Sequence, residues 1–150
     1  MNKKSYSLKD LFFLYTHLPE FRSILYYLLK GKAKYIQWIA PGMSNLYINC
    51  FPIGPGLVIQ HGFSTIINAK SIGCNCQIWQ NVTIGVSKSH MEESKPTIGD
   101  NVKICANSVV IGNITVGNNV IIGAGTVVTR DIPDNCTVVG NPAHIIHKNH

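Results

Sequence analysis

The feature that most constrains the fold is a six-residue period that begins at Ile53 and continues almost to the end of the chain. Branched apolar residues recur at its first position: Ile53, Ile59, Ile66, Ile72, Ile78, Ile84, Ile98, Ile104, Val110, Val116, Ile122 and Val128. Mostly small or apolar residues lie four positions later: Leu57, Phe63, Cys76, Val82, Val102, Ser108, Ile114, Val120, Thr126 and Ile132. A fixed internal period is typical of stacked units. Because six residues fit neither a helical turn nor sustained strand alternation, each unit is predicted to be one short strand and one turn.

Three such units close a triangular coil of about 18 residues, and the coils stack at the strand spacing of about 4.8 Å. The twelve units listed above make about four coils. Residues at the first position are expected to point inward, and glycine and asparagine at the corners tolerate positive φ. The sequence therefore predicts a mainly β protein, a parallel β-helix.

The period fails at two places. The step from Ile59 to Ile66 is seven residues, which predicts one inserted residue just after His61. The step from Ile84 to Ile98 is fourteen, so an extruded polar loop is expected at residues 86–97. Loops that interrupt a rigid scaffold often carry function, although a tolerated insertion is the alternative.

The N-terminal segment predicts helices over residues 7–31. Ser7 and Asp10 resemble a capping box, Pro19 fits the first turn of a second helix, and Gly31 fits its C-terminal cap. Residues 32–52 show no lasting period and are interpreted as a connector. We therefore expect two regions, helices and connector at 1–52 and the β-helix at 53–150.

An apolar stripe on the second helix has two interpretations. Its members are Phe21, Ile24, Leu25, Leu28 and Leu29, at helical spacing. The stripe either packs on the protein or a neighbouring subunit, or makes residues 7–34 a peripheral membrane contact. The second interpretation places these side chains at an anionic surface: Tyr26, Tyr27, Arg22, Lys30 and Lys32.

Composition and charge limit the function classes. The chain is 45% hydrophobic and 13% charged, against a usual charged share of about 25%, which suits a repeat structure or an oligomer with buried sides. The net charge is +6, but no nucleic-acid motif is present, so we expect no nucleic-acid partner. Five cysteines without framework spacing favour reduced thiols, and the apolar run at 11–15 is too short for a signal or membrane segment. These features predict a cytoplasmic protein.

The repeats resemble the hexapeptide acyltransferases, in particular the serine acetyltransferase branch and related polysaccharide O-acetyltransferases. The resemblance covers about residues 53–146. Its segments are Ile53-Gly-Pro-Gly-Leu-Val-Ile-Gln-His61-Gly, Gln80-Asn-Val-Thr-Ile-Gly85, Pro96-Thr-Ile-Gly-Asp-Asn-Val102, Ile111-Gly-Asn-Ile-Thr-Val-Gly117, Ile122-Gly-Ala-Gly-Thr-Val-Val128 and Val138-Val-Gly-Asn-Pro-Ala143.

The resemblance implies a left-handed coil and a homotrimer with active sites between neighbouring subunits. It also implies acetyl-CoA as donor, a hydroxyl as acceptor and His61 as the general base. Ala106, Ala124 and the turn at Gly85 match the positions that line the family's pantetheine groove.

Acetyl transfer needs a base, an oxyanion site and a bound donor. A histidine imidazole can accept a hydroxyl proton near neutral pH, and such a base typically contributes about 10²–10⁴-fold. A backbone N–H at a corner, at Gly85 or in the loop, would hold the oxyanion. The cations available for CoA phosphates are Lys88, Lys95, Lys103, Arg130 and Lys148. No metal site is expected, because Cys74 and Cys76 supply only two ligands and His144, His147 and His150 form a polar tail.

Two departures from the serine-specific pattern concern the base. No acidic residue lies between Phe21 and Met91, and Lys95 directly precedes Pro96 where the resemblance implies a histidine. The group that orients His61 is therefore left open between a backbone carbonyl, a neighbouring subunit, Asn68, Asn81, Glu92, Glu93 and Asp100, and His90 is a candidate for the missing histidine.

A third departure lies at the chain ends, which lack the large helical domain and the isoleucine tail of many serine acetyltransferases. On this basis the first hypothesis is acetyl transfer to a sugar or polysaccharide precursor. The alternatives are a serine O-acetyltransferase and a non-catalytic β-helix that docks on a membrane or partner.

Overall fold

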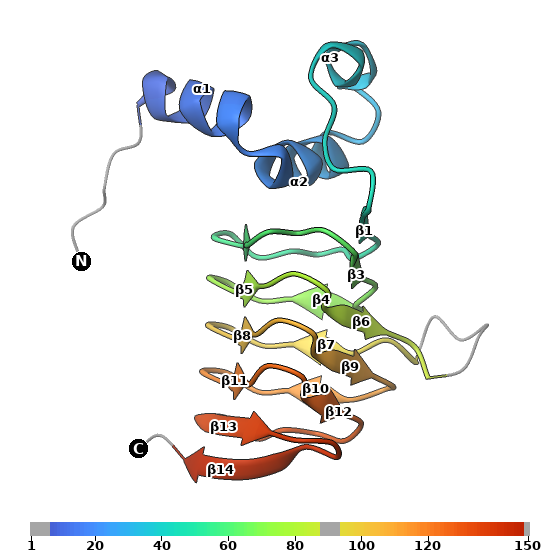
Figure 1. The fold of residues 1–150 in the computed structure, drawn as a ribbon, viewed down its shortest axis with the longest axis vertical. Coiled ribbons are helices and arrows are strands. Elements are labelled where there is room, and N and C mark those ends of the chain that lie inside the picture. The colour runs from blue at the N-terminus through green and yellow to red at the C-terminus, as the bar shows by residue number, and fades with distance from the viewer. Residues whose placement is uncertain (1–6, 88–93, 149–150) are drawn as a thin grey trace. The chain divides into compact units, whose positions relative to one another are not determined.

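The computed structural model describes residues 7–87 and 94–148, and it divides the chain into two units (Figure 1). The first unit, Met1–Ser44, holds the helices, and the second, Asn45–His150, holds the strands. The division falls before the boundary at 52/53 that the sequence indicated, because the coil already begins at β1 (Leu46–Ile48).

The first two helices begin at the residues that the sequence predicts, and the second ends next to the predicted glycine. In α1 (Leu8–His17) the Ser7 N–H donates to Asp10 Oδ2 at 2.7 Å and the Asp10 N–H donates to Ser7 Oγ at 3.3 Å, a complete capping box. Proline opens α2 (Pro19–Leu29), which ends at Lys30 and Gly31, both in the left-handed region with φ of 45° and 77°. A third helix, α3 (Lys34–Ile39), lies in the segment interpreted as a connector. Its six residues are too few to show a helical period.

Packing inside the helical unit differs from the predicted apolar stripe. Tyr26 is the buried residue of α2, and its hydroxyl donates to the Ala40 carbonyl at 2.6 Å and lies 2.9 Å from the Tyr15 hydroxyl. Arg22 donates to the carbonyls of Tyr15 and Pro41 at 2.8 and 2.9 Å. Tyr26 and Arg22 are therefore internal contacts that join α1, α2 and the segment after α3, and the expectation that they face a membrane is wrong.

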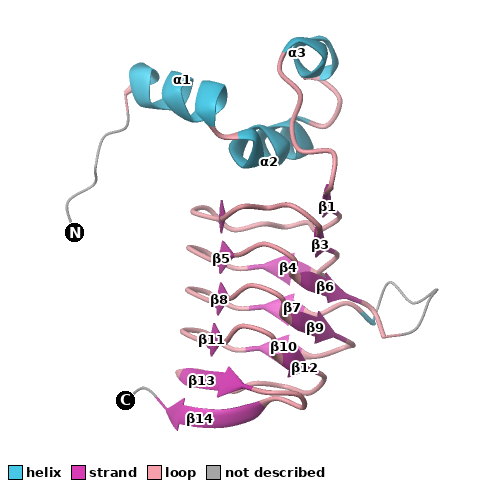
Figure 2. Cartoon of the chain, in the orientation of Figure 1, coloured by secondary structure: helices cyan, strands magenta, loops and turns pink. Residues whose placement is uncertain are grey.

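The second unit is a left-handed parallel β-helix with three sheets (Figure 2). One sheet contains β1, β3 (Thr65–Ile67), β6 (Thr83–Gly85), β9 (Val109–Ile111) and β12 (Val127–Val128). The second contains β4 (Ser71–Ile72), β7 (Thr97–Ile98) and β10 (Thr115–Val116). The third contains β2 (Val58–Ile59), β5 (Gln77–Ile78), β8 (Lys103–Ile104), β11 (Ile121–Ile122), β13 (Cys136–Val139) and β14 (His144–Lys148). All pairs are parallel except β13 with β14.

The β-helix has five levels rather than the four that the hexads alone predict. The sheet that contains β1 has five strands, and parallel bridges from Ile53 to Ile72 and from Val116 to Ile132 complete the sheet that contains β4. The first and last levels borrow residues outside the regular period, β1 and β13, which explains the difference. The chain leaves the coil after β6 and returns at β7, as the fourteen-residue step predicts.

The core and the corners follow the repeat. The first-position residues from Ile72 onward are at most 2% exposed, in the columns that the period assigned to the interior. One corner carries a column of asparagines with φ of 55–57°, Asn75, Asn101, Asn119 and Asn135. Their side-chain amides bond from level to level at 3.5, 3.1 and 2.9 Å. Asparagine suits these positions because its short polar side chain tolerates the left-handed region.

The interior pattern changes around His61. Ile66 and Phe63, both assigned to the interior by the period, are 44% and 43% exposed, whereas Ile67 and Thr65 are fully buried in their place. The register confirms this shift, since Ile67 pairs with Ile84 and Ile66 with Thr83. Inward residues are thus eight apart from Ile59 to Ile67, so two residues are inserted rather than one, and the next side of the coil is one residue shorter.

Candidate active site

The two inserted residues are His61 and Gly62. Corner residues of successive levels are joined by hydrogen bonds, in which the Gln60 N–H donates to Ile78 and the Asn81 N–H to Phe63, at 2.8 and 3.1 Å. Gln60 therefore lies over Trp79 and Phe63 over Gln80, and the pair between them has no counterpart in the level below. The insertion places a histidine at the corner as a bulge.

Local backbone geometry holds this bulge. His61 has a φ of 49° and its carbonyl accepts the Phe63 N–H at 2.7 Å, so the chain reverses over three residues. Ser64 returns the chain to the coil with a φ of 52°, the same conformation as Asn81 and Asn107 below it. Left-handed residues other than glycine cost about 1–3 kcal/mol and gather at functional sites. The side chain of His61 is exposed.

No hydrogen bond from the His61 imidazole to another residue is found in the described part of this chain. The candidates from the sequence are occupied elsewhere: Asn68 Oδ1 accepts from Asn49 at 3.1 Å, Asn81 donates to Asn107 at 3.1 Å, and Asp100 Oδ1 accepts the Cys74 N–H at 2.7 Å. Glu92, Glu93 and His90 lie outside the described residues. Among described residues the orienting group is therefore absent from the chain that carries the base.

Small side chains lie beneath the bulge in the same corner column. The Asn107 N–H donates to Gln80 and the Gly125 N–H to Ala106, at 3.1 and 3.0 Å, so Phe63, Gln80, Ala106 and Ala124 stack on successive levels. Levels are about 4.8 Å apart, which puts Ala124 about 14 Å below Phe63. Ala106 is half-buried and Ala124 is exposed. The structure thus brings His61, Ala106 and Ala124 to one corner.

Gln80 is a residue of this column that the sequence analysis missed. Its Oε1 atom is buried and has no hydrogen-bond partner, a property it shares with Thr126 Oγ1 among described residues. A buried acceptor without a partner costs about 1–3 kcal/mol. The signal was available only through the register, because the insertion at His61 conceals which residue lies in the next level.

Gly85 lies at a different corner from the column. It ends β6, pairs with Ile111 and is buried, and a Cβ atom added there would meet no atom within 4 Å. Within one chain, Gly85 and the His61 corner lie at opposite ends of the same sheet, one strand apart. Two lysines were also predicted to bind the acetyl-CoA donor. Lys88 lies outside the described residues, and Lys148 is the last residue of β14.

The other predicted cations differ in exposure. Lys103 is exposed, whereas Lys95 is only 8% exposed and Arg130 donates to the Ala143 carbonyl at 2.9 Å. Burial raises the pKa of the nearby Cys50 thiol to about 11, although the positive charge of Lys95 acts in the opposite direction. Within the described residues, no three histidine, cysteine or acidic side chains gather in a metal-binding group. No described helix is long and apolar enough to cross a membrane.

Comparison with known proteins supports the same family. The model of the family "Bacterial transferase hexapeptide (six repeats)" matches residues 95–130. The chain is 43% identical over 97 residues to the serine acetyltransferase of Synechococcus elongatus, covering 64% of this chain and 40% of that one. The solved serine acetyltransferase of Neisseria gonorrhoeae has a TM-score of 0.68 and 31% identity, covering 89% of this chain and 56% of that one.

A Brucella abortus serine acetyltransferase solved in complex with coenzyme A has a TM-score of 0.67 and 27% identity, covering 89% of this chain and 58% of that one. The chain therefore spans between two fifths and three fifths of the length of these relatives. The repeats, the sheets and the relatives agree, and this chain is a hexapeptide-repeat, left-handed β-helix protein that resembles the serine acetyltransferases.

Proposed function

We propose that the chain is an acetyl-CoA-dependent O-acetyltransferase in which His61 is the general base. The imidazole takes the proton of an acceptor hydroxyl, and the hydroxyl oxygen forms a bond to the thioester carbonyl carbon. As the carbon–sulfur bond breaks, the proton on His61 passes to the departing thiolate. The products are an acetyl ester and free CoA thiol, and no other reactant is needed.

The observation that carries this proposal is the two-residue insertion at one corner of an otherwise regular coil. The insertion exposes an imidazole, and the coil does not need the two inserted residues, because the levels below turn the same corner without them. The regular levels below it need no such feature to fold. A bulge that presents a base is explained by chemistry at this corner.

The donor fits the column beneath the bulge. Because Ala106 and Ala124 have small side chains, they leave room along this corner for the extended thioester arm of the donor. The reactive end of that arm would lie towards His61. Gly85 lies at the other corner and has open space beside it. In the proposed trimer, the Gly85 corner of a neighbouring subunit would lie at the site that contains His61. Lys88 and Lys148 are proposed to bind the phosphates of CoA.

The acceptor that we propose is the hydroxyl of serine. The sugar or polysaccharide acceptor favoured by the chain ends finds no support among the relatives, which are serine acetyltransferases. The missing aspartate and loop histidine change how the base is oriented. These two differences do not change the hydroxyl chemistry. The identity of the acceptor is therefore inferred from the relatives and not from the missing aspartate and histidine.

A homotrimer with sites between subunits completes the proposal. The first two levels expose large apolar side chains at the bulge or on the two sheets that meet there: Tyr47, Val58, Phe63 and Ile66. Such a cluster is typical of an interface rather than of a surface in water. A neighbouring subunit that covers it would also supply the group that orients His61.

Acetyl-CoA turnover with a panel of acceptors tests the function, with release of free CoA thiol as the readout. Serine is expected to be acetylated, and sugar hydroxyls at the same concentration are expected to react at least ~10-fold more slowly. Turnover with sugars alone would restore the first hypothesis from the sequence. No turnover with any acceptor, together with no CoA binding by calorimetry, would leave a non-catalytic docking module.

A further inference from the structure

The helical unit exposes a surface that catalysis does not use. On α3 three large side chains face solvent, with Tyr35 86%, Trp38 88% and Ile39 77% exposed. Two exposed lysines, Lys32 and Lys34, lie directly before them in the chain. These five residues are called the α3 surface. Aromatic rings with flanking lysines are the side chains that bind the interface between water and lipid.

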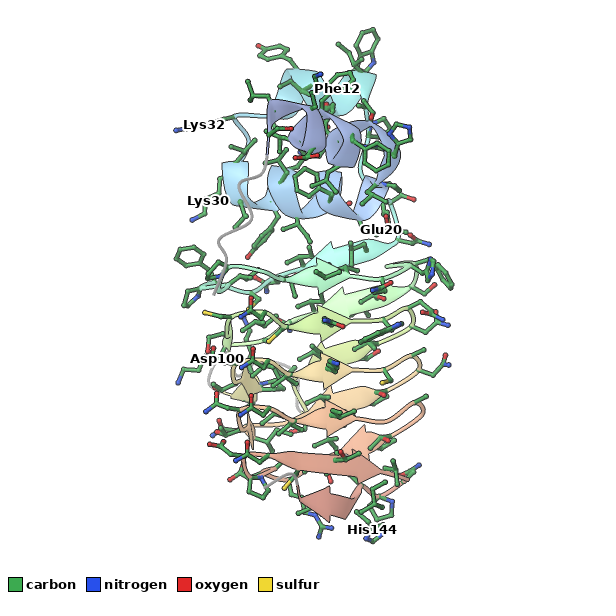
Figure 3. The ribbon with its side chains drawn as sticks, turned by 90° about the vertical axis from the view of Figure 1, so that its left-hand side faces the viewer. Phe12, Glu20, Lys30, Lys32, Asp100 and His144 are labelled. Atoms are coloured by element: carbon green, nitrogen blue, oxygen red, sulfur yellow. The ribbon has the colours of Figure 1, made fainter. Side chains whose placement is uncertain are left out.

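A second apolar face lies on α1. Leu8 and Phe12 are 84% and 69% exposed, and Leu11 and Phe13 are also exposed. Tyr15 lies on the same side of α1, about two turns after Leu8, and it packs edge-on against Tyr26 of α2, so α2 covers only the C-terminal end of this face. The rest of this apolar face, from Leu8 to Phe12, is left without a covering partner in the helical unit. Figure 3 shows Lys30 and Lys32 extending away from the helices.

Charge indicates what the partner is. Residues 1–34 hold seven basic and two acidic residues, and the remaining residues hold six basic and five acidic ones. One of those two acids, Asp10, is bound to Ser7 in the capping box. The surface therefore combines apolar side chains with unneutralised positive charge, which matches an apolar layer faced with negative groups.

A two-fold contact with a second copy of the chain fits this surface less well. In a two-fold contact the same surface is present on both sides, so the lysines of one copy would face those of the other. Like charges brought together oppose association. Since none of the described helices can span a bilayer, the contact would lie along it.

We propose that the α3 surface and the exposed face of α1 dock the protein on an anionic lipid bilayer. Docking would hold the enzyme at a membrane surface whatever its acceptor, so it is independent of the proposed catalysis. The ring of Trp38 and the side chains of Ile39 and Phe12 would enter the headgroup region, with Lys32 and Lys34 at the lipid phosphates.

Co-sedimentation of the full chain with vesicles tests this proposal. Binding is expected to vesicles of phosphatidylcholine with 30% phosphatidylglycerol, and to be much weaker with phosphatidylcholine alone or in 0.5 M salt. Lys34→Gln should weaken binding about fivefold, and Lys32→Gln with Lys34→Gln roughly 30-fold. Trp38→Ser should weaken it at least ~10-fold.

A matched control separates this surface from general positive charge. Lys70→Gln removes the same charge from an exposed lysine of the β-helix and should leave binding unchanged. Circular dichroism verifies that each variant keeps its fold. No binding to anionic vesicles, or equal losses in Lys34→Gln and Lys70→Gln, would overturn the proposal. So would a Trp38→Ser variant that binds vesicles normally but changes oligomeric state by light scattering, which would make the α3 surface a contact between copies.

Discussion

Replacement of His61 by asparagine is the sharpest test of the proposed base. Asparagine tolerates the left-handed conformation that His61 adopts at φ 49°, but it cannot accept a proton at neutral pH. A general base contributes about 10²–10⁴-fold, so kcat should fall by that factor, which corresponds to a barrier higher by about 3–5 kcal/mol.

The structure also gives the expected effect on stability. The His61 side chain is exposed and makes no hydrogen bond within the described part of the chain, so His61→Asn should change the free energy of unfolding by no more than about 0.5 kcal/mol. His61→Ala removes the same base, but alanine lacks the short polar side chain that makes the left-handed region easier for asparagine, so it should be less stable than the asparagine variant by about 1 kcal/mol. Both variants should lose the same activity, although the alanine variant should unfold at a lower temperature than the asparagine variant.

Thiol-release kinetics, thermal unfolding and light scattering on the same samples separate these effects. The asparagine variant should remain a trimer with the thermal midpoint of the parent chain. If it retained activity within about threefold, His61 would not be the base. If instead activity fell only in proportion to the loss of trimers, the bulge would be a structural feature of the interface.

Three further predictions concern the scaffold. Gly99→Ala should destabilise the fold by about 1–3 kcal/mol, because its Cβ would lie 2.8 Å from the Gly117 carbonyl carbon. Gly85→Ala is the matched control for folding, because a Cβ there meets open space, and this variant should raise KM for acetyl-CoA. Because burial raises the pKa of Cys50 from 9.0 to about 11, its alkylation at pH 8 should be about 100-fold slower than in the unfolded chain. The alkylation rate, measured by mass spectrometry, should increase as the pH rises towards 11. Equal rates in the folded and unfolded chains would refute the burial of Cys50. Gln80→Met should raise the thermal midpoint by removing an unpaired buried acceptor, and a fall of several degrees would show that another subunit pairs with the amide.

The period of six was sufficient to predict the β-helix because each level repeats the same steric requirement. A branched residue such as Ile104 or Val110 fills the interior, and the next level must match it in register. Capping residues were equally predictable, since Ser7 with Asp10 and Pro19 act within one turn of helix. Local and periodic signals are readable because they depend on few residues.

The parts that the sequence misassigned depend on competition between neighbours. Ile66 and Ile67 are equivalent by residue type, and only the register with Thr83 and Ile84 decides which one enters the core. Tyr26 is buried through hydrogen bonds to Ala40 and Tyr15, which a hydrophobic stripe does not encode. The position of Gln80 beneath the bulge could not be found until the insertion was counted as two residues.

The misassigned residues of the β-helix, Phe63, Ile66 and Gln80, lie at or next to the corner where the site is proposed. Phe63 and Ile66 remain 43% and 44% exposed in a single chain, so covering them fully would contribute roughly 1 kcal/mol for each side chain. The left-handed conformation of His61 adds a further cost. A neighbouring subunit that covers these two side chains would recover the burial at the moment it completes the site. Assembly and catalysis would then depend on the same insertion, so that deletion of His61 and Gly62 together should yield a more regular coil that neither trimerises as tightly nor transfers acetyl.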